Sequence, residues 1–437
     1  MEQYQRVCQL AKELLPEAVA FTQRLVRCPS APGEEKNAAD MFIAEMEKIG
    51  YDEVFRDDWG NVIGVINGQE PGPTILCNAH MDHVPVGDLS LWDGYDPFGG
   101  LVDVVEMDDR YAAKKEMAEV IHGRGTADVK GGMACHIYGG KLLLQLRKEG
   151  VKLKGKYIIT AVCMEEFGDQ VGTIQLIDDT FKKLGWSYDG VISSEASSLG
   201  FNLGHRGRVE LLVSVHGKIG HASAPWTGIN AVCKATKLID IVTNELPKQF
   251  PPEEPDLGPS TICLTVINAI PGELCVVPER CDITFDRRFG PEETPEGCMQ
   301  EIQEIIDKLS QEDPEFRAEV KISEVVREFY TGKSVTIANK KLSWKLSPEH
   351  PFVQAMADGL KAVGQEIQYR HWFGGTDLSK VVADDHKPAL GYGAGQEQYT
   401  HVPFEVLRTD FMEKVIAGYA AGFLKLMELP KEAFRVD

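Results

Sequence analysis

The sequence has no apolar run long enough to cross a lipid bilayer, which takes about 20 consecutive residues. Its first residues, Met1–Arg6, lack the basic and apolar regions of a secretory signal, so we expect a cytoplasmic protein. The ten cysteines form no Cys-x-x-Cys pair, and several lie in apolar runs. We therefore expect free thiols in a reducing compartment and no disulfide framework.

Basic residues are scarce relative to acidic ones. The chain has 46 Lys and Arg against 67 Asp and Glu, which gives a formal net charge of -21 at pH 7. Nucleic acids and anionic membranes bind basic surfaces, so neither is expected as a partner. Part of the acidic excess is available to neutralise bound divalent cations.

The composition that remains is that of an ordinary globular protein, with 43% apolar and 26% charged residues. The 437 residues exceed what one hydrophobic core usually accommodates, so two domains are expected.

Short apolar strands alternate with helical periodicity in the first half of the chain and again near its end. This alternation predicts an α/β catalytic domain with a mostly parallel twisted sheet, built from two pieces, 1–206 and 346–437. The intervening residues 207–330 follow the order strand, helix, strand, strand, helix, strand, which predicts an α+β, ferredoxin-like lid or dimerisation domain. Residues 331–345 are assigned to a connecting segment, and the chain from 331 to 349 is expected to be irregular.

A His and an Asp stand two residues apart where a buried strand is expected to end. The apolar run 74–77 leads into His80 and Asp82. Side chains alternate along a strand, so the two point the same way. One can bind a metal while the other holds the second ring nitrogen of the His. Alone, the pair favours a polar strand end, and only the further sites along the chain reverse that interpretation.

Asp128 lies in the glycine-rich segment 123–132, where the backbone can approach a ligand closely. A carboxylate there can bridge two cations, or it can cap the helix that follows. A phosphate-binding loop is the third reading, and it is set aside because the segment lacks the Gly-Lys-Ser/Thr ending.

Two adjacent carboxylates, Glu165 and Glu166, follow the apolar strand 157–163. They repel each other unless a cation or a shared proton relieves them, or unless both are solvated. One of them can bind a metal while the other serves as a general base.

Glu195 follows another buried strand, and His401 follows the glycine-rich run 391–395. All these residues fall at the rim of the sheet, where α/β folds bind ligands. The set suits two cations that share Asp128, one bound by His80 and Glu195 and the other by Glu166 and His401. A His-plus-carboxylate set favours zinc, with cobalt or manganese as alternatives.

In this order, the motifs resemble the family of dinuclear zinc hydrolases that contains acetylornithine deacetylase, succinyl-diaminopimelate desuccinylase, carboxypeptidase G and the aminoacylases. The resemblance covers nearly the whole chain and is nearest to the subgroup of selenium-metabolism-linked hydrolases. It is carried by these residues: His80 to Pro85, Trp92, Asp96 to Phe98, Gly123 to Gly132, Glu165, Glu166, Glu195, His401 and Glu405.

The resemblance implies roles for individual residues. The expected metal ligands are His80, Asp128, Glu166, Glu195 and His401. Glu165 would be the general base that activates a metal-bridging hydroxide, and Asp82 would orient His80. His221, in the lid motif 215–225, would stabilise the oxyanion, reaching the site from a dimer partner in dimeric relatives. Substrate would be bound by Arg288, whose guanidinium suits a carboxylate, and by Gly375 and Thr376.

The resulting hypothesis is a dinuclear zinc amidohydrolase or peptidase. It would act as a deacylase or dipeptidase on the linear amide bond of a small N-acyl amino acid or dipeptide, and we expect a homodimer formed through the lid. Two alternatives remain open at this point. One is a catalytically silent binding or assembly protein on the same fold, and the other is a thiol enzyme using Cys135 or Cys163.

Overall fold

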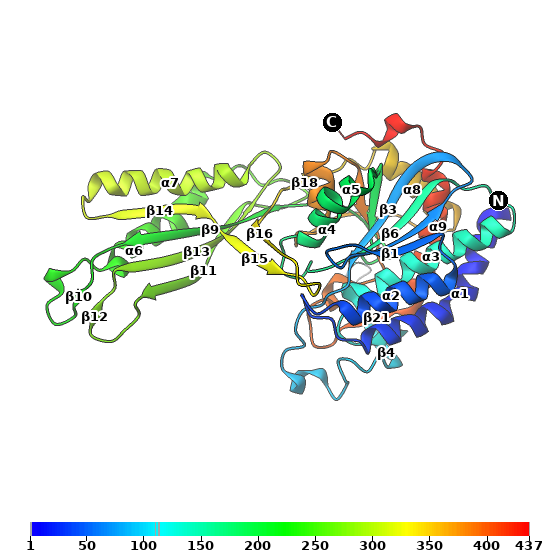
Figure 1. The fold of residues 1–437 in the computed structure, drawn as a ribbon, viewed down its shortest axis with the longest axis horizontal. Helices are drawn as coiled ribbons and strands as arrows, with labels where there is room; N and C mark the ends of the chain where they lie inside the picture. The colour runs from blue at the N-terminus through cyan, green and yellow to red at the C-terminus, as the bar shows by residue number, and fades with distance from the viewer. Residues whose placement is uncertain (1, 110, 112–113, 437) are drawn as a thin grey trace.

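The chain folds into two units, and each is built on a large β-sheet with its own hydrophobic core (Figure 1). The computed structural model describes residues 2–109, 111 and 114–436. Within these residues no helix combines the length and the apolar character needed to span a bilayer.

The larger sheet is mixed and has nine strands. Its four central strands, β6, β3, β7 and β20, pair in parallel, and antiparallel strands flank them. Parallel strands covered on both faces are mostly apolar where they are buried, as the second half of β6 and most of β7 are. In spatial order the strands are β1 (Glu53–Arg56), β2 (Val62–Asn67), β6 (Lys154–Val162), β3 (Glu70–His80), β7 (Gly190–Ser193), β20 (Ala389–Gly391), β8 (Phe201–His205) and β18 (Trp344–Lys345), with β19 (Tyr369–Trp372) beside β8.

Helices from both ends of the chain cover this sheet. The first and last helices, α1 and α9, pack on each other and on α3, which joins the two sequence pieces into one unit. The helices are α1 (Glu2–Val26), α2 (Lys36–Ile49), α3 (Gly131–Lys148), α4 (Val171–Gln175), α5 (Lys182–Leu184), α8 (Pro351–Ala362) and α9 (Thr409–Leu426). A small sheet beside them contains β4 (Val102–Asp109), β5 (Lys114–His122) and β21 (Val406–Arg408).

The second large sheet is antiparallel and projects away from the first (Figure 1). Along β9 every second residue is buried, because one face of the strand packs on two helices. Thr294 accepts a hydrogen bond from the Gly297 amide and starts the second of these helices. The elements are β9 (Gly207–His216), β11 (Thr261–Ile270), β13 (Arg280–Phe289), β14 (Arg317–Ile322), β17 (Lys340–Lys341), α6 (Ala231–Asp240) and α7 (Pro295–Glu312).

Two ribbons and several short turns complete the chain. The ribbons pair β10 (Gly220–His221) with β12 (Val276–Val277) and β15 (Glu324–Glu328) with β16 (Ser334–Ala338). The 3-10 and π turns are η1 (Leu89–Trp92), η2 (Thr126–Lys130), η3 (Leu176–Phe181), η4 (Pro225–Thr227), η5 (Ile241–Glu245), η6 (Leu246–Gln249), η7 (Lys380–Asp384), η8 (Glu397–Tyr399) and η9 (Lys431–Phe434).

The predicted fold class is confirmed: an α/β unit with a parallel central sheet is interrupted by a separate antiparallel α+β unit. The prediction that residues 331–349 are irregular is wrong, because β16, β17 and β18 lie in that range. β17 and β18 pair with the distant strands β9 and β8, whereas β16 pairs with the neighbouring β15, and these short strands depend on such pairing more than on local propensity. The residue boundaries given above for the two domains remain predictions.

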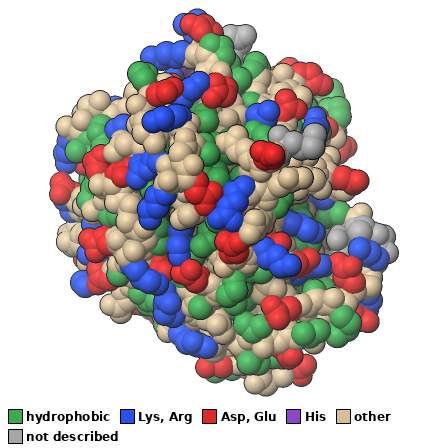
Figure 2. Space-filling view, turned by 90° about the vertical axis from the view of Figure 1, so that its right-hand side faces the viewer, with side chains coloured by type: hydrophobic (Ala, Val, Ile, Leu, Met, Phe, Trp, Pro, Cys, Tyr) green, Lys and Arg blue, Asp and Glu red, His purple; other side chains and the backbone are tan. Residues whose placement is uncertain are grey.

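Acidic and basic side chains are interspersed on the face of the large domain that lies opposite the lid, shown in Figure 2. Surface ion pairs of the large domain include Lys141 with Glu17 and Arg6 with Glu149. The net negative charge therefore does not gather into one acidic patch on that face.

Candidate metal centre and active site

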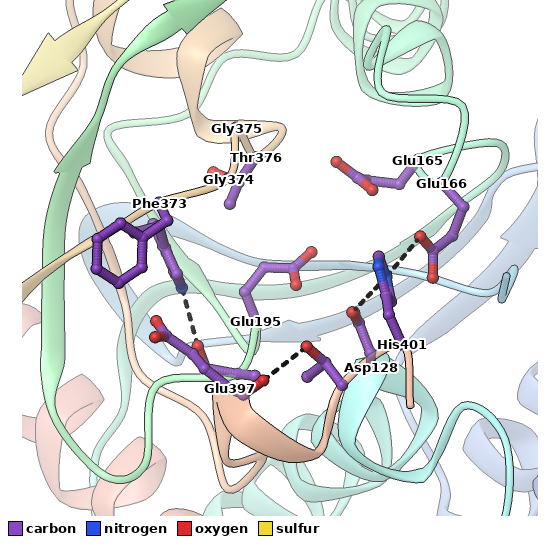
Figure 3. Close-up of a pocket in the computed structure, with 13 residues that line it drawn as sticks. Asp128, Glu165, Glu166, Glu195, Phe373, Gly374, Gly375, Thr376, Glu397 and His401 are labelled. Atoms are coloured by element: carbon purple, nitrogen blue, oxygen red, sulfur yellow. Dashed lines mark hydrogen bonds and ion pairs between the residues drawn. The ribbon is translucent and has the colours of Figure 1, made fainter. Parts of the chain in front are cut away.

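Three parallel strands end at the same edge of the large sheet, and each delivers a polar side chain there. His80 is the last residue of β3, Glu165 follows β6, and Glu195 follows β7. Loops bring Asp128 and His401 to the same edge (Figure 3). The pocket holds about 310 Å³ and is lined by Asp128, Glu165, Glu166, Glu195, Ala196, Trp372, Phe373, Gly374, Gly375, Thr376, Glu397, Thr400 and His401.

Asp128 stands between two histidines, and each of its carboxylate oxygens faces one of them. Its Oδ1 lies 3.1 Å from His80 Nε2, and its Oδ2 lies 3.1 Å from His401 Nε2. Glu195 Oε1 lies 3.5 Å from His80 Nε2, and Glu166 Oε2 lies 3.1 Å from His401 Nε2. The donor atoms thus form two groups that share one carboxylate.

The site also contains two candidate metal-ligand groups, and both include His80. The ligand atoms of His80, Asp128 and Glu166, and those of His80, Glu165 and Glu195, each lie within 4.8 Å of one another. Burial and the neighbouring Asp128 raise the pKa of Glu166, and burial raises the pKa of Glu195 well above its usual range. Glu166 Oε1 is buried and has no hydrogen-bond partner within the part of the chain that the structure describes. A bound cation would relieve both the repulsion and the missing contact.

Two local alternatives for these residues are wrong. Asp128 does not cap a helix, because Gly125 and Lys130 occupy the cap positions of η2 and α3. Glu165 and Glu166 are not a solvated pair, because their side chains are only 12% and 5% exposed. Both carboxylates are therefore held out of water, where they interact strongly with nearby charges.

Asp82 contacts His80 in a way that differs in atomic detail from the expectation. His80 Nδ1 lies 3.1 Å from the backbone carbonyl oxygen of Asp82 and 3.5 Å from its carboxylate. The carboxylate accepts hydrogen bonds from the amides of Glu165 and Glu166, at 3.1 and 2.9 Å. Asp82 thereby ties the end of β3 to the two glutamates after β6.

Glu405 supports the Asp128 loop. In the sequence it is recognised only as part of the family motif, and no role is predicted for it. Its buried carboxylate accepts hydrogen bonds from the amides of Ala127 and Asp128, at 3.0 and 3.1 Å. It also pairs at 2.5 Å with the guanidinium of Arg124, whose side chain is 3% exposed. The loop that carries Asp128 is thus fixed by a buried ion pair.

We expect Glu405→Ala to lower the free energy of unfolding by about 3–5 kcal/mol, because Arg124 would remain as an unpaired buried charge. Urea denaturation followed by circular dichroism measures this change. Glu432→Ala, at an exposed position, is the control. A loss in Glu405→Ala no greater than in the control would contradict the role of the pair.

The predicted substrate and lid residues lie at different distances from the pocket. Gly375 and Thr376 line it. Arg288 lines an adjoining pocket of about 260 Å³, with its Nε 2.6 Å from Asp286. His221 is exposed on β10, at the end of the lid remote from the large sheet (Figure 1). The structure therefore brings the substrate loop to the site, and within one chain it does not bring His221 there.

The thiol alternative finds no support in the geometry. Cys135 and Cys163 are fully buried, and neither lines the pocket. Burial raises the pKa of both thiols far above the ordinary value. A thiol held this way is a poor nucleophile.

Comparisons with known proteins agree with this geometry. Residues 203–314 match the family model described as the peptidase dimerisation domain. The chain is 28% identical over 422 residues to YgeY of Escherichia coli K12, an uncharacterised protein, covering 96% of both chains. It is 29% identical over 304 residues to succinyl-diaminopimelate desuccinylase of Methylobacterium nodulans, covering 67% of this chain and 71% of that one.

A solved structure shares the fold over nearly the whole chain. It is the Bacillus subtilis YXEP protein, described as a dinuclear metal binding peptidase from the M20 family, with a TM-score of 0.68 at 15% identity, covering 95% of this chain and 99% of that one. Fold, ligand cluster and inserted domain together define a metal-dependent hydrolase. These matches support the M20 family of aminoacylases and peptidases, in agreement with the resemblance predicted from the motifs.

Proposed function

We propose that the protein hydrolyses the linear amide bond of a small N-acyl amino acid or dipeptide, using two divalent cations and Glu165 as the general base. The observation that supports this most directly is the position of Asp128, whose two oxygens face His80 and His401. One cation would be held by His80, Glu195 and Asp128, and the other by Glu166, His401 and Asp128. Zinc suits these nitrogen and oxygen donors, with cobalt or manganese as alternatives.

The chain's own residues would orient the reactants and move the proton. When bound, the cations supply Lewis acidity toward water and the scissile carbonyl. Glu165 takes the proton from the attacking water and passes it to the leaving amine. Burial raises the pKa of Glu165 to about 8, while Lys341 lowers it. A carboxyl group in that range can both accept and donate a proton near neutral pH.

The lid would contribute to substrate binding and to the oxyanion. The dimerisation-domain match supports a homodimer. In that dimer we propose that His221 of one protomer stabilises the oxyanion in the site of its partner. Arg288 would bind the substrate carboxylate, and Gly375 and Thr376 would position the backbone of the substrate.

A panel of N-acetyl, N-succinyl and N-carbamoyl amino acids and of dipeptides, assayed with added zinc, cobalt or manganese, tests this function. We expect turnover of at least one class. Chelation should reduce it to background, and re-added metal should restore it, because the cations supply the Lewis acidity. Full activity in metal-free protein would contradict the proposal. Stoichiometric metal binding with no turnover of any compound would instead favour the binding-protein alternative.

A further inference from the structure

A buried lysine contacts the candidate general base. Lys341 Nζ lies 2.9 Å from Glu165 Oε1, and the Lys341 side chain is 2% exposed. The same ammonium donates a hydrogen bond to the carbonyl oxygen of Gly375 at 3.2 Å. This ammonium group therefore joins the loop after β6, which carries Glu165, to the loop that carries Gly375.

The stem of Lys341 also packs against the glycine loop. A Cβ added at Gly375 would lie 3.2 Å from Lys341 Cδ, so the absence of a side chain there makes room for the lysine. In Figure 3 the carboxylate of Glu165 points toward Gly374–Thr376 and away from His401. The contact with Lys341 accounts for that orientation.

Lys341 comes from the segment by which the chain returns from the lid. It lies on β17, opposite Arg208 of β9, where the two units join. The preceding residue, Lys340, points to the surface and pairs with Glu296 at 2.7 Å, with 37% of its side chain exposed. Because side chains alternate along a strand, only Lys341 faces the pocket.

We propose that Lys341 is a positioning residue: it holds the Glu165 carboxylate and the Gly374–Thr376 loop in the relative arrangement that the reaction requires. This inference rests on the function proposed above. Lys341 has no part in binding metal, since an ammonium group has no free lone pair. Its loss should therefore affect the rate more than metal content or substrate affinity.

Kinetics of Lys341→Met, with Lys340→Met as the matched control, tests the proposal. We expect Lys341→Met to lower kcat by about 100-fold, because a small misplacement of a reacting group costs a factor of that order. Metal content should equal that of the parent, since an ammonium group binds no metal. KM should change less than kcat, since substrate binding depends on Lys341 only through the position of the Gly374–Thr376 loop. Lys340→Met should match the parent in all three quantities.

A double-variant comparison separates positioning of Glu165 from a general structural role. In a Glu165→Gln background, single-turnover measurements should show a smaller loss on adding Lys341→Met than the parent does, because the carboxylate that Lys341 positions is already gone and the contact with Gly375 is what remains to be lost. An equal loss in both backgrounds, or an unchanged kcat in Lys341→Met alone, would overturn the proposal.

Melting temperatures test the contact between Lys341 and Glu165 without any substrate. Failure to find a substrate would count against the proposed function and not against this contact. Lys341→Met should lower Tm by on the order of 5–10 °C, because Glu165 is left buried without its partner. Adding Glu165→Gln should recover part of that loss. Strictly additive shifts would show that the two side chains do not interact.

Discussion

Replacing Glu165 by Gln should lower turnover by about 10²–10⁴-fold, the range expected for loss of a general base. Gln keeps the size of the side chain and can still accept a hydrogen bond from Lys341, but it cannot take a proton from water. Steady-state kinetics on a substrate found in the panel, with metal content measured in parallel, checks this result. We expect the bound metal to equal that of the parent protein.

Metal content decides whether Glu165 is the general base or a metal ligand, because Glu165 lies as close to His80 and Glu195 as a ligand would. If Glu165 is the base, Glu165→Gln keeps its metal, whereas the matched variant Glu166→Gln loses some of it. Glu166 suits the ligand role because one of its buried oxygens has no partner among the described residues and the other lies 3.1 Å from His401. Metal loss in Glu165→Gln, or unchanged turnover, would remove Glu165 from the role of base.

Strand periodicity made much of the site predictable. His80, Glu165 and Glu195 each follow an apolar run, and parallel strands bring their carboxyl ends to one edge. The sequence alone therefore indicates that these three side chains meet. Their proposed division between two cations depends on the Asp128 loop, which is held by hydrogen bonds to Glu405 and by the Glu405–Arg124 ion pair.

What the sequence did not reveal are residues whose roles depend on pairing across long separations. Lys341 lies 176 residues from Glu165, in a stretch with no strong strand pattern of its own. Lysine is also a common surface residue, and nothing local distinguishes Lys341 from Lys340 until β17 pairs with β9. If residues 340–341 had been predicted as a strand, the alternation of side chains would have indicated that one of the two lysines faces inward.

The hairpin of β4 and β5 was missed for a related reason. Its strands are rich in charged residues, and most of β4 is exposed, so no apolar run marks them. They pair with each other, and β5 also pairs with β21, which comes almost 300 residues later. Local propensity is a weak guide where pairing and packing decide.

Asp128→Ala should remove metal from both positions, because each oxygen of this carboxylate faces one of the two histidines. Its oxygens lie 3.1 Å from His80 and 3.1 Å from His401. With two ions about 3.5–4 Å apart, losing the shared anion also leaves their mutual repulsion uncompensated. We expect bound metal to fall from about two equivalents to less than one, with activity at background.

His401→Ala is the matched control for that result, because His401 pairs with Asp128 and Glu166 and is assigned to the second cation alone. Its 53% exposed side chain lies at the rim, so its loss should disturb the fold little. We expect this variant to keep about one equivalent of metal, bound by His80, Glu195 and Asp128. Elemental analysis of both variants after dialysis against trace zinc measures the difference. If Asp128→Ala kept as much metal as His401→Ala, the carboxylate would not be shared, and the two-cation site would have to be replaced by a single-ion site built around His80.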